Sequence, residues 1–98
     1  MKAILLTGVL GLVIGCGPVE STAVILQANT ALLQAKAAGA EQNSPYEYTA
    51  AEQYLHKARE LWGTSNFEYA WDYAAKARDL ATKAHQDSWT KDRDEAAD

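Results

Sequence analysis

Two stretches of this 98-residue chain match each other at a constant offset of 19 residues. YTAAEQYLHKAREL, residues 48–61, aligns with FEYAWDYAAKARDL, residues 67–80. Each stretch places aromatic residues and alanines in alternation at steps of three and four, which is the spacing of one helix face. Large side chains of one helix can then fill the gaps above the alanines of the other. The repeat predicts two similar helices along a shared seam, with matched positions at Tyr48 and Phe67, Ala51 and Ala70, Tyr54 and Tyr73, Ala58 and Ala77, Leu61 and Leu80.

Sequence signals for helix ends mark the limits of these two helices. SPYE at 44–47 has the form of a capping box, with proline at the first helical position, and SNFE at 65–68 repeats the box without the proline. Gly63 lies between the boxes and is expected to end the first helix. Because few residues remain for the connection, we expect an antiparallel helical hairpin with helices at about 45–62 and 66–88.

The segment before the hairpin predicts another helix at about 21–38, capped by Ser21 and ended by Gly39. It carries apolar stripes on two opposite faces, so both faces need a cover. We expect one stripe to pack on the rest of the chain, and the other on a second chain, a partner or a lipid surface. The alternative is an alanine-rich helix with two exposed leucines. The inner stripe comprises Ile25, Ala28, Leu32 and Ala35, and the outer one Leu26, Leu33 and Ala37.

The residue composition favours helices over strands. Alanine is the commonest residue, β-branched residues become rare after Ile25, and Pro18 and Pro45 are the only prolines. The length allows one small domain. We therefore expect an all-α fold class, in which a signal peptide precedes a three-helix domain at 21–88, and a polar, frayed tail follows at 89–98.

The first 15 residues have the layout of a secretory signal peptide. Lys2 supplies a positive charge, residues 3–14 are almost entirely apolar, and small residues follow them. A membrane-spanning helix needs about 20 apolar residues, and this run is shorter and interrupted by glycines. A transmembrane anchor is the alternative interpretation.

The end of the apolar run, VIGC at 13–16, resembles the lipobox of bacterial lipoproteins. In such proteins the cysteine becomes the first residue of the mature chain, and diacylglycerol and a further fatty chain such as palmitate anchor it to a membrane. The resemblance implies lipidation of Cys16, the only cysteine, followed by a tether at 16–20. Gly17 stands where an aspartate retains many lipoproteins at the inner membrane, which implies an outer-membrane anchor facing the periplasm.

The small and aromatic alternation on a hairpin resembles the tetratricopeptide repeat over residues 45–84. The lipobox, the short spacer and the paired motifs YLHKARE at 54–60 and YAAKARD at 73–79 are also similar to a family of small bacterial envelope lipoproteins whose domain has no defined function. Such domains occur alone or ahead of peptidoglycan-binding domains. The resemblance implies an envelope protein or peptidoglycan as the partner.

Charge and side-chain chemistry weigh against several functions. Lys2 is the only charged residue among the first 15, so the remaining chain carries 8 basic and 13 acidic residues and a formal charge of −5. Nucleic-acid binding needs a basic patch, which this chain lacks. Glu52, His56 and Glu60 share a helix face, but no second cluster completes a metal site. We expect no catalytic activity, no cofactor and no bound metal.

The aromatic residues divide into core and surface candidates. Exposed rings anchor protein interfaces and stack on sugars, so Tyr69, Trp71 and the nearby Arg78 form the candidate contact patch. We expect an interaction or structural module, and alternatively a module that binds peptidoglycan or another envelope molecule. A homo-oligomer formed through the outer stripe also remains open. The aromatic residues expected in the core are Tyr48, Tyr54, Trp62, Phe67 and Tyr73.

Overall fold

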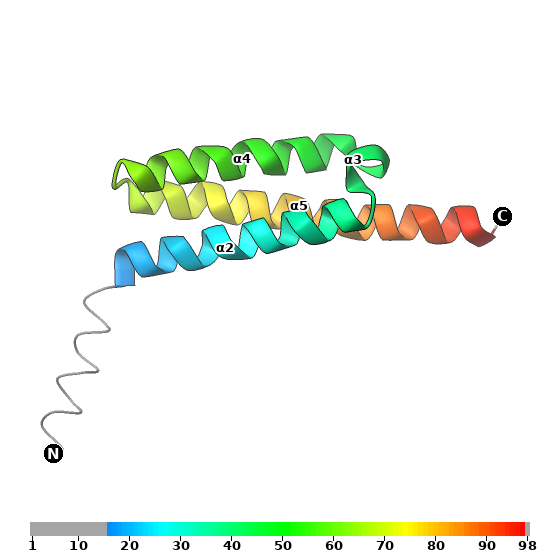
Figure 1. The fold of residues 1–98 in the computed structure, drawn as a ribbon, viewed down its shortest axis with the longest axis horizontal. Coiled ribbons are helices and arrows are strands. Elements are labelled where there is room, and N and C mark those ends of the chain that lie inside the picture. The colour runs from blue at the N-terminus through cyan, green and yellow to red at the C-terminus, as the bar shows by residue number, and fades with distance from the viewer. Residues whose placement is uncertain (1–15, 98) are drawn as a thin grey trace, which may run out of the picture.

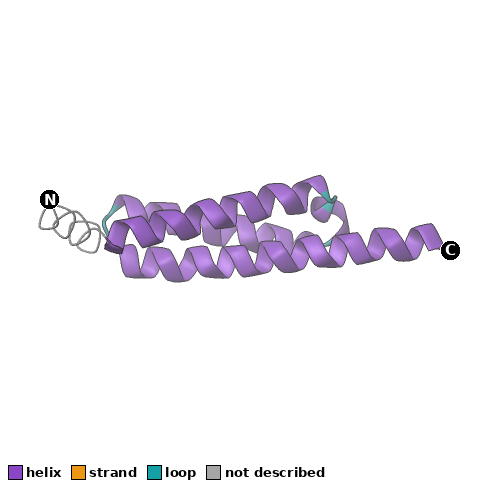
Figure 2. Cartoon of the chain, turned by 90° about the horizontal axis from the view of Figure 1, so that it is seen from below, coloured by secondary structure: helices purple, strands orange, loops and turns teal. Residues whose placement is uncertain are grey.

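The computed structural model describes residues 16–97, which form four helices and no strand. Figure 2 shows helices joined by short connections along the whole described chain. The predicted all-α class is confirmed, whereas the predicted signal peptide at 1–15 lies outside the described residues. Among residues 16–97, no helix is both long and apolar enough to cross a membrane. The helices are α2 (Cys16–Ala37), α3 (Ala40–Asn43), α4 (Pro45–Gly63) and α5 (Phe67–Ala97).

The longest helix, α5, holds the bundle together. Both α2 and α4 pack along α5 and meet each other less extensively. In Figure 1, α4 runs antiparallel to α5, and the two form a hairpin, while α2 runs in the same direction as α5. The short α3 connects α2 to α4 at one end of the bundle. The sequence predicts three helices, with a polar connection where α3 lies. This part is wrong, because the segment forms a short helix in which Ala40 is buried.

A stripe of small side chains on α5 forms the centre of the core. Its members are separated by alternating steps of four and three residues, which keeps one face of a helix turned towards its neighbours. Because alanine has only a methyl group, the backbones of α2 and α4 can approach α5 closely. The members are Ala70, Ala74, Ala77, Ala81, Ala84 and Ser88, all fully buried.

The repeat places its matched residues in matching positions on α4 and α5. Ala51 and Ala58 on α4 are fully buried, as are their counterparts on α5. The rings of Tyr54 and Tyr73 lie 5.8 Å apart between centroids. The ammonium group of Lys76 lies over both rings, 5.7 and 5.4 Å from their centroids. The seam of the hairpin thus combines alanine contacts with a tilted pair of tyrosine rings under the Lys76 cation.

The expected aromatic core is only partly present. Tyr48 is buried, and Tyr54, Phe67 and Tyr73 are half-buried. The core assignment of Trp62 is wrong, because its side chain is 42% exposed. Trp62 lies in the last turn of α4 and contacts Phe67 edge-on at 6.1 Å, so its ring covers the end of the seam without entering it.

The start of α2 differs from the prediction. Residues 16–20 are helical, so the expected tether is wrong. A proline in the first turn lacks only an N–H group that would have no partner inside the helix, which lets Pro18 join it. Ser21 is therefore no cap. It lies in the helix interior, is 1% exposed, and donates a hydrogen bond of 2.7 Å to the carbonyl oxygen of Phe67 on α5.

Both connections contain a residue in the left-handed region. Gly39 has φ of +84° and ends α2, as its sequence position predicts, and a Cβ there would lie 3.3 Å from the Asn43 side chain. Ser65 has φ of +66°. The Asn66 N–H donates to the Leu61 carbonyl and the Ser65 N–H to the Trp62 carbonyl, at 2.8 and 3.1 Å. This pattern is a Schellman motif, so Ser65 terminates α4 and does not cap α5.

Ser44 lies at the predicted helix start, but its side chain makes a different hydrogen bond from the one a helix cap makes. Ser44 directly precedes Pro45, the first residue of α4, and makes no side-chain bond to the backbone. Its hydroxyl instead donates to the Glu47 carboxylate at 2.7 Å. This bond is the first cause of a lowered pKa for the Glu47 carboxyl, to which the nearby Lys83 cation adds.

The prediction of a frayed tail at 89–98 is wrong for the described part, because α5 continues to Ala97. After Gly63 the chain contains no glycine or proline, and alanine is the commonest residue of α5, which favours helix. Trp89 is 55% exposed and lies under the Arg93 guanidinium at 4.6 Å. The end of α5 therefore projects beyond α3 as a solvated helix (Figure 1).

Candidate functional site

Two arginines at matched positions of the repeat hold α2 from both sides. Arg59 on α4 donates to the Asn29 side-chain oxygen at 3.1 Å. Arg78 on α5 donates to the Gln27 side-chain oxygen at 3.1 Å, and its Nε lies 3.3 Å from Asp79. Because the sites are exposed, the bonds add little energy. They show how α2 is aligned along the hairpin. The arginine shared by the two copies of the repeat was visible in the sequence. The sequence did not indicate that Asn29 and Gln27 would be the hydrogen-bond acceptors.

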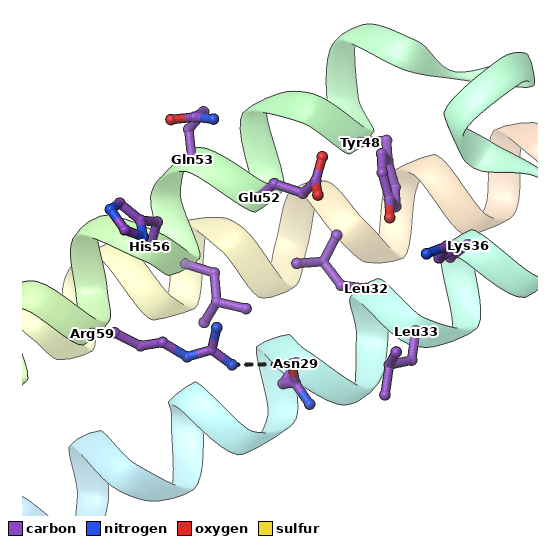
Figure 3. A pocket seen from close by; sticks show the side chains of 10 residues that line it. Asn29, Leu32, Leu33, Lys36, Tyr48, Glu52, Gln53, His56 and Arg59 are labelled. Atoms are coloured by element: carbon purple, nitrogen blue, oxygen red, sulfur yellow. Dashed lines mark hydrogen bonds between the residues drawn. The ribbon is translucent and has the colours of Figure 1, made fainter.

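The weak contact between α2 and α4 leaves an open groove of about 520 Å³ between them. Figure 3 shows its walls: Leu32, Leu33 and Lys36 rise from α2, and Glu52 extends from α4. The Arg59–Asn29 hydrogen bond crosses the groove at one end. The lining residues are Asn29, Leu32, Leu33, Lys36, Tyr48, Glu52, Gln53, Leu55, His56 and Arg59.

The groove presents hydrogen-bonding groups of both charges on an apolar floor. Burial raises the pKa of the Tyr48 hydroxyl above its usual range, and the negative charges of Glu52 and Glu41 raise this pKa further. A hydrogen bond between the Tyr48 hydroxyl and the Glu41 carboxylate contributes to the raised pKa as well. At the rim, His56 lies 3.1 Å from the Glu60 carboxylate, and both side chains are exposed. Such a lining suits a peptide or another polar chain.

The helix face that carries Glu52, His56 and Glu60 holds ion pairs. His56 pairs with Glu60, while Lys57 approaches the same carboxylate at 3.6 Å and neutralises it. Within the described residues, no group of three or more histidine, cysteine, aspartate or glutamate side chains is placed to hold a metal ion.

The structure does not bring the candidate contact patch together. Tyr69 and Trp71 are 61% and 41% exposed, but residues two apart on a helix point about 200° away from each other. Trp71 lines a hollow of about 300 Å³ beside Glu20 and Asp72, and Tyr69 is not part of its lining. Arg78 lines a different hollow, between α2 and α5. Cys16, the predicted lipidation site, is the first residue of α2.

A further surface lies on the outer face of α2. Val19, Leu26 and Leu33 are 64%, 60% and 60% exposed, and they follow one another at steps of seven residues. Leu26 and Leu33 belong to the predicted outer stripe, whereas the sequence reasoning missed Val19. The seven-residue spacing of Val19, Leu26 and Leu33 could have revealed this face. Val19 was missed because residues 16–20 were expected to form a tether and not a helix. Trp62 extends this surface, since it lines an apolar hollow together with Thr22, Ile25, Leu26 and Arg59.

Comparison with known proteins identifies a family for this bundle. The model of a family described as "Domain of unknown function (DUF4398)" matches residues 23–98, which include most of α2 and all of α3, α4 and α5. No curated protein and no solved structure matches the chain.

Proposed function

The chain belongs to the DUF4398 family, and on that premise we propose that it is a lipid-anchored bacterial envelope protein whose helical bundle is a small interaction module without catalytic activity. The observation that carries the proposal is the VIGC sequence at 13–16, after an apolar run and a single lysine. The anchor is a lipidated Cys16, and the address is the outer membrane, facing the periplasm.

The geometry of α2 supports this reading of Cys16. Because α2 begins at Cys16, a lipid on that residue connects directly to the bundle without a flexible spacer. Fatty chains contribute about 0.8 kcal/mol for each buried methylene group, so two or three chains anchor a small domain stably. The groove between α2 and α4 then begins at Asn29, about 20 Å along α2 from the anchor, where an envelope protein can reach it.

Labelling in cells tests the anchor. The full chain is expressed in a double-membraned bacterium supplied with a palmitate analogue that carries an alkyne. We expect the analogue on the wild-type chain, which sediments with outer membranes, and neither result for Cys16→Ser. An intact amino-terminal methionine and a free thiol in the mass spectrum of the wild-type chain would refute the anchor.

Crosslinking in the intact envelope tests the interaction module. A photoreactive amino acid at Gln53, which lines the groove, is compared with one at Gln86, an exposed position on α5 outside the groove. We expect a discrete crosslinked species from Gln53 only, because a partner held in the groove lies within reach of that residue. Equal, diffuse crosslinking from both positions would show that the groove holds no partner.

A second candidate function is binding of glycan strands. The hollow beside Trp71 combines an exposed ring with the carboxylates of Glu20, Glu68 and Asp72, and rings and carboxylates together suit sugar faces and hydroxyl groups. We expect Trp71→Ala to abolish sedimentation of the chain with purified cell wall. Tyr69→Ala is the matched control, since it removes an exposed ring on the other side of α5. Equal sedimentation of both variants and wild type rejects this function.

A further inference from the structure

The outer face of α2 carries a second complete seam. Its members follow one another at alternating steps of four and three residues, the same spacing as the buried stripe of α5, and all are exposed. No charged residue occurs between Ser21 and Ala35. In Figure 1 no described helix lies on the side of α2 that faces away from α5. The members are Val19, Ala23, Leu26, Thr30, Leu33 and Ala37.

Part of this seam already has the shape that receives a side chain. A hollow of about 340 Å³ on α2 is lined by Val19, Thr22, Ala23 and Leu26. These residues stand at positions i, i+3, i+4 and i+7, the four that enclose one side chain of a facing helix in knobs-into-holes packing. The hollow is shallow and open, and its four lining residues have the spacing that surrounds one large apolar side chain of a facing helix.

The order of large and small residues decides which helix fits. Large side chains at Val19, Leu26 and Leu33 alternate with small ones at Ala23, Thr30 and Ala37. An antiparallel copy of α2 with its Leu33 in the hollow sets Leu33 against Ala23. The same register sets Leu26 against Thr30 and Val19 against Ala37, so every layer pairs a large residue with a small one. A parallel copy would set Leu26 against Leu26 and bring only an alanine to the hollow.

We propose that a second copy of this chain docks on the outer face of α2, with the two α2 helices antiparallel about a twofold axis. The contact is self-complementary, because each Leu33 enters the hollow of the other copy, as a closed twofold dimer requires. The stretch between residues 21 and 35 brings no charge of α2 into the seam, while Arg59 and Arg78 lie at its edges beside Leu26. The dimer goes beyond the proposed anchor and groove and holds whether or not Cys16 carries lipid.

The composition of the face favours a protein partner over a lipid surface. Helices that lie in the membrane interface carry lysine or arginine on their polar face and large aromatic or aliphatic residues on the other. α2 has no aromatic residue, and Lys36 is its only basic one. The seam spans 18 residue steps, about 27 Å of helix, so the dimer is at the small end of specific interfaces. Its population should therefore depend on concentration.

Disulfide trapping tests the register in the full chain in its membrane. Chains with Ala23→Cys and chains with Leu33→Cys are produced together and separately, then oxidised, and the linked peptides are identified by mass spectrometry. We expect the 23–33 link only when both variants are present, because a disulfide needs Cα atoms within about 7 Å. A link from Leu33→Cys to itself would show a parallel pair, and no link would refute the dimer.

A charge in the seam provides an independent test. Leu26→Lys keeps the fold, because the side chain is exposed in the monomer, but it brings two lysines into the apolar contact. We expect the dissociation constant of the dimer, measured by sedimentation equilibrium, to rise at least about tenfold. Tyr46→Lys, at an exposed position of α4, should leave this constant unchanged. A monomer at every concentration refutes the dimer. Binding to phosphatidylcholine vesicles that Leu26→Lys abolishes, without self-association, would assign the face to lipid and refute it as well.

Discussion

The helices α4 and α2 both pack along α5, but they are held by different means. The contact of α4 with α5 contains the Tyr54–Tyr73 pair, the Lys76 ammonium over both rings, and the edge contact of Trp62 with Phe67. Its two helices are joined by a short turn. The contact of α2 with α5 contains no aromatic side chain from α2 and is marked by single hydrogen bonds from Ser21 and Arg78.

The two contacts should therefore differ in stability. Aromatic rings bury large areas, and a short turn costs little closure entropy, so we expect the hairpin to be the more stable part of the bundle. α2 is an alanine-rich helix with small side chains on its buried face. Its position depends on close approach of the backbones and on a few side-chain hydrogen bonds. A helix of this kind can detach before the hairpin unfolds.

The largest effect is expected from overpacking the stripe that both contacts share. Ala77 is fully buried on α5, and Ala77→Trp forces an indole between closely packed backbones. We expect a loss of about 3 kcal/mol or more in the free energy of unfolding, enough to remove cooperative melting in a domain of this size. Gln86→Trp on the exposed face of α5 is the control. Cooperative thermal melting of Ala77→Trp would show that the seam is not close-packed.

A matched pair of leucines separates the hairpin from α2. Leu55 on α4 and Leu32 on α2 are 3% and 8% exposed, and each change to alanine should cost about 2–4 kcal/mol. We expect hydrogen exchange to increase in α2 alone for Leu32→Ala, and throughout the bundle for Leu55→Ala. The same pattern of exchange in both variants would mean that α2 and the hairpin form one cooperative unit.

A smaller effect is expected where α2 begins. Ser21→Ala removes the buried hydrogen bond to the Phe67 carbonyl, which should destabilise the protein by about 1 kcal/mol. The loss should appear as faster hydrogen exchange near residue 21. Ser21→Cys keeps only a weak S–H donor on a somewhat larger side chain and should recover part of the loss. No change in exchange would indicate that neighbouring apolar contacts alone hold this end of α2.

The smallest effect concerns acid stability of the hairpin. The pKa of Glu47 is lowered from its ordinary value of 4.5, chiefly by the Ser44 hydroxyl, so the folded state prefers the carboxylate. Its contribution to stability is present above pH 4.5 and is lost as the pH falls through the lower folded pKa. We expect Glu47→Gln to flatten the acid limb of a denaturation curve, and Ser44→Ala to flatten it less. An unchanged acid limb would contradict the assignment.

The sequence predicted the hairpin well because two independent signals agreed. The offset repeat and the proline-containing cap at 44–47 both placed α4, and alanines at matched positions proved buried. The second cap was misread because SNFE satisfies two patterns. A serine before a helix can cap it or, with positive φ, end the previous one, and only the backbone distinguishes these. The tail was misread because charge was given more weight than helix propensity.

The candidate site was less accessible from the sequence. The partners of Arg59 and Arg78 depend on how α2 is docked, and no local pattern states the register between helices that are distant in the sequence. The groove between α2 and α4 is similarly a product of that docking. In contrast, the separation of Tyr69 from Trp71 follows from helix geometry alone, since residues two apart diverge.

The parallel course of α2 and α5 gives the molecule two distinct poles. The first residue of α2 lies at one end of the bundle, and the last residue of α5 lies at the other (Figure 1). The 31 residues of α5 span about 46 Å as a straight rod. If one pole is held at a fixed point, the charged last turns with Trp89 and Arg93 sweep a region nearly 5 nm away. The described ends of α2 and α5 are therefore separated by about the full length of α5.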